Sequence, residues 1–357
     1  MKRSLLFRIH SWAGLISGLF ILLMSISGTI LVFHEEIDSF QYPSIQQETG
    51  KPVISIDYAY QALQKKFPHA QISSCMLPEN AKQLFIFSMY DSSYQQGKQS
   101  LQVFMHPQTA EILWQRGGSQ DLQHNFMAWL TVFHNSFHLE QKGEWLLGFF
   151  GVIFLLSICT GILLYRKQVV SVLLFRKWMF RKRNLHQLIG VYALLFNLMI
   201  GFTGVWMQRY VFTKDFYAYR MAYTPVRKAS PPLFFSIDSA LQRAGETYPA
   251  FTPYVIYFAS SKQAKTAVYG SRSTNLFIHS KKYADALFLD SMGHIAKTAF
   301  VSEIIPENRR DIINAQLHYG RFGGIAIKLL YSIFGITGGL LGITGCLLRI
   351  KRRKQFI

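Results

Sequence analysis

Histidines gather at the ends of the long apolar stretches of this 357-residue chain. The chain holds 11 histidines, and five stand at such ends: His10, His34, His134, His186 and His318. Imidazole is a ligand for iron, copper, nickel and zinc. Ionisable residues at membrane depth are costly and usually functional, although a single interfacial histidine often only extends to the head groups. Five such positions indicate metal or cofactor binding.

The spacing around His10 and His186 favours haem. Each is followed four residues later by a glycine, Gly14 and Gly190. Positions i and i+4 share a helix face, so a flat porphyrin can approach the backbone there; close helix packing is the other explanation for these glycines. Two histidines without a carboxylate suit catalytic zinc poorly, whereas two axial imidazoles complete a haem. No CxxCH motif is present, so the haem would be non-covalent, and His-only ligation favours electron transfer.

One cofactor cannot serve all five histidines. His10 and His34 flank the same apolar stretch and are 24 residues apart, which is about 36 Å along a helix. We therefore expect one cofactor at each end of the stretches.

Four apolar stretches must position these side chains, and basic residues without any acid flank one end of each stretch. All 19 acidic residues lie in 35–144 and 209–324, whereas 15 of the 38 basic residues lie in three short segments. Lys and Arg collect in short cytoplasmic loops, and about 20 apolar residues cross a bilayer. We predict transmembrane segments 1–34, 145–165, 188–208 and 325–348, periplasmic domains 35–144 and 209–324, a cytoplasmic loop 166–187 and a cytoplasmic tail 349–357.

This partition also explains the net charge of +19. The basic segments would contact the anionic inner leaflet, so no nucleic acid is expected as a partner. The first apolar stretch has no evident small-residue cleavage site, so we interpret it as a retained anchor. No Gly-x-Gly-x-x-Gly lies between a strand and a helix. The electron donor must then be a separate reductase, reduced flavin or a quinol.

The sequence contains an internal duplication, in which the second half matches the first at an offset near 180 residues. His10 and Gly14 correspond to His186 and Gly190, His134 to His318, and Thr160-Gly161 to Thr344-Gly345. Each copy is a span, an outer domain and a second span in the same orientation, which implies a pseudo-two-fold axis along the membrane normal.

Each outer domain is predicted to be a small α+β unit. In the first copy, Ser55 or Asp57 can cap a helix that ends near Phe67, before a proline. Alternating apolar residues predict strands at Gln83–Tyr90, Ser100–Met105, Thr252–Ala259, Thr266–Gly270 and Ala286–Leu289.

Five motifs occur in order: Arg8-Ile9-His10-Ser11-Trp12-Ala13-Gly14, His34-Glu35-Glu36-Ile37-Asp38, Phe133-His134-Asn135-Ser136-Phe137, His186-Gln187-Leu188-Ile189-Gly190 and Leu317-His318-Tyr319-Gly320-Arg321-Phe322-Gly323-Gly324. Together they resemble the PepSY-associated transmembrane family, and especially its branch of iron-regulated inner-membrane ferric-siderophore reductases. The resemblance implies a membrane α-helical plus α+β protein with four transmembrane helices in two span–PepSY-like domain–span repeats. It also implies two non-covalent haem b groups and reduction of ferric siderophores on the periplasmic side of the bacterial inner membrane.

On this hypothesis His10 and His186 bind the iron of the cytoplasmic-side haem, and His134 and His318 that of the periplasmic-side haem. His34 is an alternative outer ligand and His138 a weaker one. The expected haem-propionate partners are arginines, namely Arg3, Arg8, Arg183 and Arg321. Carboxylates that could orient the axial histidines are Glu35, Glu36 and Asp38. Aromatics that could line a siderophore cleft are Phe216, Tyr217, Tyr219 and Tyr223.

Two other function classes fit parts of the pattern. One is a non-redox PepSY membrane protein that regulates a periplasmic peptidase. The other is a siderophore or metal transporter, which the duplication suggests; no mid-span proline or carboxylate supports it. The particular siderophore, the electron donor and the oligomeric state are left open by the sequence.

Overall fold

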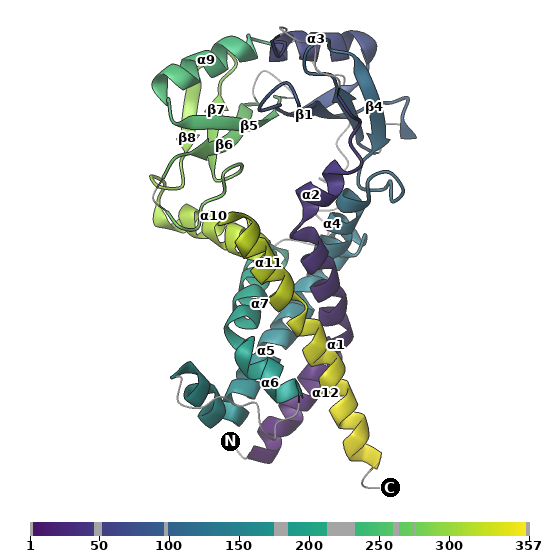
Figure 1. Cartoon of the computed structure of the whole chain (residues 1–357), viewed down its shortest axis with the longest axis vertical. Helices are drawn as coiled ribbons and strands as arrows, with labels where there is room; N and C mark the ends of the chain where they lie inside the picture. Colours follow the sequence, from purple (N-terminus) through teal and green to yellow (C-terminus); the bar gives the residue numbers. More distant parts are fainter. Residues whose placement is uncertain are drawn as a thin grey trace. The chain divides into compact units, whose positions relative to one another are not determined.

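The computed structural model describes residues 3–45, 52–95, 99–174, 185–212, 233–259, 264–274 and 276–354. It consists of two compact units (Figure 1). The helical unit comprises Met1–His34, Leu130–Tyr223 and Asn314–Ile357. The sheet unit comprises Glu35–Trp129 and Thr224–Ile313. Both halves of the duplicated sequence contribute to each unit.

The helical unit is built from long apolar helices and the shorter helices that adjoin them. Its elements are α1 (Arg3–Leu31), α4 (Phe126–Ser136), α5 (Glu140–Leu173), α6 (Leu185–Tyr192), α7 (Leu194–Gln208), η2 (Arg209–Phe212), α10 (Pro306–Tyr319), α11 (Gly324–Gly335) and α12 (Thr337–Lys354), of which α4 and α10 begin in the sheet unit. Helix α1 packs along α5 and α12, and α5 packs along α7 (Figure 1).

Glycines allow α1 and α12 to approach closely. A Cβ atom on Gly342 would lie 2.7 Å from the backbone oxygen of Gly18, which is too close for any larger residue. Small residues at such crossings are typical of helix packing in membranes.

Three helices of the described chain are long and apolar enough to cross a membrane: Arg3–Leu31, Glu140–Val172 and Gly324–Lys351. The pair Leu185–Tyr192 and Leu194–Phe212 meets the same criteria only when taken together, because it bends by 67°. The protein is therefore a multi-pass membrane protein with three spans, or four when the bent pair counts as one.

The bend lies at Ala193, where the backbone leaves the helical region (φ −92°, ψ 8°). The buried Asn197 side chain donates from Nδ2 to the Ala193 oxygen at 3.0 Å and to Thr337 Oγ1 at 2.8 Å. Side chains that hydrogen-bond into a helix ladder are a recognised cause of kinks. The repeat-related α1 has no such break, so the two copies differ here.

In the sheet unit, the helices Ile56–Lys66 and Ile237–Thr247 pack on one antiparallel sheet. Its helices are α2 (His34–Ser39), α3 (Ile56–Lys66) and α9 (Ile237–Thr247), and its strands are β1 (Gln71–Met76), β2 (Phe85–Tyr90), β3 (Leu101–Met105), β4 (Ile112–Gly117), β5 (Phe251–Tyr257), β6 (Thr266–Arg272), β7 (Asp285–Leu289) and β8 (Ile295–Ala299). The strand order is β4-β3-β2-β1-β5-β6-β7-β8. The two copies thus share a single sheet, joined where Cys75 of β1 opposes Ile256 of β5.

The predicted strands are confirmed with slightly shifted ends, but β1, β4 and β8 were not predicted. Their sequences carry few apolar residues in strict alternation; β8, for example, reads IAKTA. These segments become strands because they pair with β5, β3 and β7, respectively. Such pairing between segments cannot be predicted from the local sequence alone.

Ser55, one of the two caps predicted for the first copy, caps α3, and Ser236 caps α9 in the same way. Ser55 Oγ accepts from the Tyr58 N–H at 3.1 Å, and Ser236 Oγ accepts from the Ser239 N–H at 3.0 Å. Each helix ends two residues before a proline, Pro68 or Pro249, which agrees with the end predicted near Phe67. Ala59 and Leu63 of α3 and Ala240 of α9 are buried in one core with the sheet.

The N-termini of α3 and α9 cap each other across the repeat boundary. Asp238 accepts from the Ile56 and Asp57 N–H groups at 3.0 and 2.9 Å, and Asp57 accepts from the Ile237 N–H at 2.7 Å. Carboxylates at a helix N-terminus satisfy orphan donors and complement its dipole. The exchange of caps ties the two copies together.

The swapped caps predict a cross-helix effect. Asp238→Ala should loosen α3 rather than only its own helix, because it removes the acceptor of two α3 amides. A lost cap costs about 1 kcal/mol, so exchange in the 52–60 peptide should accelerate about fivefold. Hydrogen-exchange mass spectrometry on the full chain measures this. The control, Glu246→Ala, removes the same charge from the exposed side of α9; equal acceleration in both variants would contradict the prediction.

Candidate functional site

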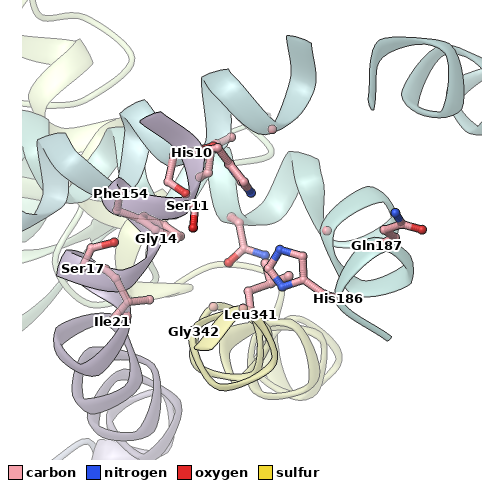
Figure 2. A pocket seen from close by; sticks show the side chains of 18 of the residues that line it. His10, Ser11, Gly14, Ser17, Ile21, Phe154, His186, Gln187, Leu341 and Gly342 are labelled. Carbon is pink, nitrogen blue, oxygen red and sulfur yellow. The ribbon is translucent and has the colours of Figure 1, made fainter. Parts of the chain in front are cut away.

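The structure brings His10 of α1 and His186 of α6 together inside the helical unit. Their ring centroids are 6.1 Å apart and the rings are inclined by 70°. Both line a cavity of about 560 Å³, and Figure 2 shows them entering it from different helices. Gly14 and Gly190, the glycines expected beside a flat cofactor, also line this cavity.

A second pair is built in the same way. His134 of α4 and His318 of α10 have ring centroids 6.4 Å apart, with the rings inclined by 48°. His34 begins α2. His138 has a left-handed backbone (φ 57°) in the turn between α4 and α5. The structure therefore brings together one of the predicted outer pairings.

The ring separations fit a shared iron. A metal–imidazole bond is about 2 Å and a ring nitrogen lies roughly 1 Å from its ring centre, so two axial imidazoles have centres about 6 Å apart. No group of three or more His, Cys, Asp or Glu side chains in the described residues could hold a metal. A two-histidine site with the remaining positions filled by a porphyrin is thus the metal chemistry that these pairs support.

Each of the four histidines has a hydroxyl partner on a neighbouring span. His10 Nδ1 lies 3.3 Å from Thr160 Oγ1 and 2.9 Å from the Ser157 carbonyl oxygen. The other Nδ1–hydroxyl distances are 2.8 Å for His134 and Ser27, 3.0 Å for His186 and Thr344, and 2.9 Å for His318 and Thr203.

These hydroxyls determine the protonated ring nitrogen. Each hydroxyl donates its only proton to a carbonyl oxygen of its own helix, at distances of 2.7 or 2.8 Å: Ser27 to Leu23, Thr160 to Leu156, Thr203 to Met199, and Thr344 to Leu340. A hydroxyl that donates to its helix carbonyl accepts from Nδ1, and this assignment places the proton of the neutral histidine on Nδ1. For His10 the Ser157 carbonyl oxygen, which can only accept, gives the same assignment. Nε2 keeps its lone pair, which is the form that binds a metal.

A glycine follows each of the four hydroxyl residues and gives the imidazole its space. A Cβ atom on the glycine would meet the histidine Cε1 atom at 3.0 Å for Gly28, and at 3.2, 3.2 and 3.3 Å for Gly161, Gly204 and Gly345. The dipeptides Ser27-Gly28, Thr160-Gly161, Thr203-Gly204 and Thr344-Gly345, which we call the Ser/Thr-Gly seats, therefore shape all four positions alike. Two of them, Thr160-Gly161 and Thr344-Gly345, are among the repeat-related motifs of the sequence.

Burial favours the neutral form of the His134–His318 pair, which the sequence predicts to be the outer pair. Desolvation lowers the pKa of His134 to about 3, with the neighbouring His318 ring adding to the shift. Desolvation likewise lowers the pKa of His318 to about 4. Asn314, one turn before His318, donates from Nδ2 to the Thr203 backbone oxygen at 3.1 Å, so the seat and the histidine helix are joined twice.

Two of the three carboxylates expected to orient the histidines, Asp38 and Glu35, pair with basic side chains instead. Asp38 forms a bidentate, buried ion pair with Arg116 at 2.7 and 2.8 Å, and Glu35 pairs with Lys282 at 2.7 Å. Hydroxyls take the orienting role instead. Because an isolated Ser or Thr in a span is common, only the repeated Ser/Thr-Gly pattern could have indicated this from sequence.

Three of the arginines expected near propionates, Arg3, Arg8 and Arg321, are exposed and do not line the cavity at His10 and His186. The fourth, Arg183, lies outside the described residues. The aromatics predicted to line a siderophore cleft also lie outside the described residues: Phe216, Tyr217, Tyr219 and Tyr223. Arg349, which the sequence reasoning treated only as a topology determinant, does line the cavity.

Comparison with known proteins supports one family. The model of the PepSY-associated TM region matches residues 7–352, which is nearly the whole chain. The chain belongs to this family. A search of curated proteins gave no match. Membership agrees with the apolar membrane helices, and it leaves the cofactor and the reaction to be argued from the two histidine pairs.

The Ser/Thr-Gly seats give a testable prediction. Thr344→Val keeps the side-chain shape but removes the acceptor of His186 Nδ1. The affinity for a haem held by His10 and His186 would then fall roughly 10–100-fold, as for other partners of metal-bound histidines. Thr344→Ser should retain it. The measurement is cofactor content after detergent purification. Thr203→Val should act in the same way at the outer pair alone, and loss at both pairs from either single change would contradict the independent seats.

Proposed function

We propose that this protein is an inner-membrane di-haem b electron-transfer protein that reduces ferric siderophores on the periplasmic side. The observation that carries the proposal is the likeness of the pairs His10–His186 and His134–His318. Their ring separations are similar, 6.1 and 6.4 Å, and each histidine has a Ser or Thr hydroxyl partner and a glycine that leaves space for its ring. A purely structural role for these histidines does not explain why all three features occur together at each of the four positions.

Bound haem would supply one-electron transfer, because two histidine ligands leave the iron no open position for substrate. The chain's own groups would hold it. His10 and His186 would ligate the inner haem and His134 and His318 the outer one, each through Nε2. The seats keep the proton on Nδ1, and the apolar helices exclude water from the ligating nitrogens.

The topology that we propose has four spans, with the bent pair α6–α7 as the third. Both termini and the 166–187 loop would be cytoplasmic, because the acid-free basic segments lie there. The sheet unit, which holds most of the acidic residues, would then be periplasmic. On this arrangement the haem at His10–His186 is near the electron source, and the haem at His134–His318 is near the periplasm.

The substrate proposal follows from iron chemistry and from the family. Siderophores bind Fe(III) through hard oxygen ligands, and the softer Fe(II) is bound less tightly. One electron from the protein reduces Fe(III) to Fe(II) and so releases the metal. The donor is a quinol, reduced flavin or a separate reductase, since the sequence carries no dinucleotide-binding motif.

The cofactor prediction is tested by the visible spectrum and the haem content of the purified protein. Wild type should contain two six-coordinate b-type haems per chain by the pyridine haemochrome assay. His186→Ala should remove one and His318→Ala the other, with the remaining one spectrally unchanged. The control is His294→Ala, an exposed histidine of the sheet unit, which should keep both. A colourless wild type from haem-replete cells would refute the proposal.

The reaction is tested in sealed vesicles. With a ferric trihydroxamate or tricatecholate outside and a reduced quinol as donor, ferrozine should trap Fe(II) only when wild-type protein and donor are both present. His10→Ala should lower the rate at least tenfold, because it interrupts the electron path. Movement of labelled siderophore into the vesicles without a donor would instead support a transporter.

A further inference from the structure

The inner cavity has one polar end. Arg349 of α12 and Tyr165 of α5 line it beside Ser11 and Gln187, the residues that directly follow His10 and His186. Gly345 faces His186 and Arg349 lies four residues further on, so both are on one face of α12 with Arg349 one turn nearer the C-terminus. The hydrogen-bonding groups therefore lie at the end of the cavity nearer the C-terminus of α12 than the histidine pair.

The opposite end of the cavity is lined by small and apolar residues. From His10 the lining continues along α1 through Gly14, Gly18 and Ile21, and along α12 through Gly342 and Gly338. Asn197 also reaches this end, but its amide donors already bind the Ala193 oxygen and Thr337. A flat molecule with one anionic edge and one apolar edge would fit only with its anionic edge toward Arg349.

Arg349 is also the residue that breaks the symmetry of this polar end. Thr160 and Thr344 are equivalent in the repeat, so Tyr165 and Arg349, each five residues later, are equivalent too. One copy contributes a neutral hydroxyl and the other a permanent cation. The pair can thus satisfy two carboxylates, one by a charged donor and one by a neutral donor.

Among the described residues, the guanidinium of Arg349 contacts Ser11 and Trp12 at the cavity, and no ion pair with a carboxylate is present. Nη1 lies 3.1 Å from Ser11 Oγ and 3.5 Å from the Ser11 carbonyl oxygen, and the guanidinium carbon is 4.1 Å from the centre of the Trp12 ring. All 19 acidic residues belong to 35–144 and 209–324, so none belongs to the helix ends around Arg349. Arg349 is half-buried, in contrast to Arg3 and Arg8.

We propose that Arg349 binds a propionate of the inner haem, with Tyr165 and Ser11 as the neutral donors of the same end. This inference rests on the proposed haem at His10–His186 and adds the orientation of that haem: propionates toward the basic helix ends, and the vinyl edge toward Asn197. Charge-assisted arginine–carboxylate contacts are stronger than neutral ones. Arg349 is thus a positioning residue, distinct from the basic residues that only set topology.

The test measures haem release from the full-length protein to excess apomyoglobin. Wild type should give two phases, and the phase missing from His186→Ala identifies the inner haem. Arg349→Ala should accelerate that phase about tenfold or more, as expected for loss of a supporting contact, and lower the midpoint potential of the same haem, since a nearby positive charge is removed. Arg349→Lys should restore most of both.

The matched control is Lys351→Ala, which removes the same charge from the same helix two residues away, at an exposed position. It should leave both phases unchanged. Equal effects of Lys351→Ala and Arg349→Ala, or acceleration of the outer phase, would overturn the assignment of Arg349. Arg349→Gln, an uncharged variant that keeps hydrogen-bond donors, should be intermediate; wild-type behaviour there would also overturn it. Absence of haem from wild type would instead refute the proposed function itself.

Discussion

The hydrogen bond from a histidine Nδ1 to a Ser or Thr hydroxyl is the interaction on which the functional geometry of this protein depends. The hydroxyl has already donated its proton to its own helix, so it can only accept. That restriction leaves Nε2 free on all four histidines. The glycine that follows the hydroxyl residue then lets the imidazole lie against the helix backbone. One dipeptide therefore decides both the tautomer and the position of each ring.

The seats also explain how a duplicated chain makes symmetric sites. Each histidine is seated on a helix of its own repeat: His10 on α5 and His134 on α1, His186 on α12 and His318 on α7. The rings then meet across the repeats, His10 with His186 and His134 with His318. Each repeat thus builds two half-sites, and only the assembled bundle completes a site. Because α1 and α7 each carry a seat for an outer histidine and α1 also carries His10, a shift of α1 would disturb both pairs.

The sheet unit obeys the same rule with different chemistry. Strands β1 and β5 pair across the repeats, and Asp57 and Asp238 cap each other's helices. Neither copy satisfies its helix N-terminus fully alone. These exchanged polar contacts stabilise one relative position of the two copies within the sheet unit. The symmetry is broken in two places: α6 and α7 bend at Ala193 whereas α1 continues, and Arg349 stands where the other copy has Tyr165.

The sequence by itself determined the features that depend on local pattern. Hydropathy and charge indicated the apolar spans, the repeated motifs indicated the duplicated plan, and Ser55 with the proline that follows Phe67 delimited a helix. The histidines were recognisable because imidazole at membrane depth is unusual. These signals are readable because each residue acts through neighbours within one or two turns.

Tertiary structure alone decided which groups meet. Ser27 is 107 residues from His134 and Thr344 is 158 residues from His186, and nothing local distinguishes such hydroxyls from any other Ser or Thr in a span. The same holds for Arg349, which only the cavity separates from its basic neighbours, and for β1, β4 and β8, which become strands through their partners. Chain folding, not local preference, selects a partner at that separation, because the free energy of each contact is available only when distant helices or strands are already in place.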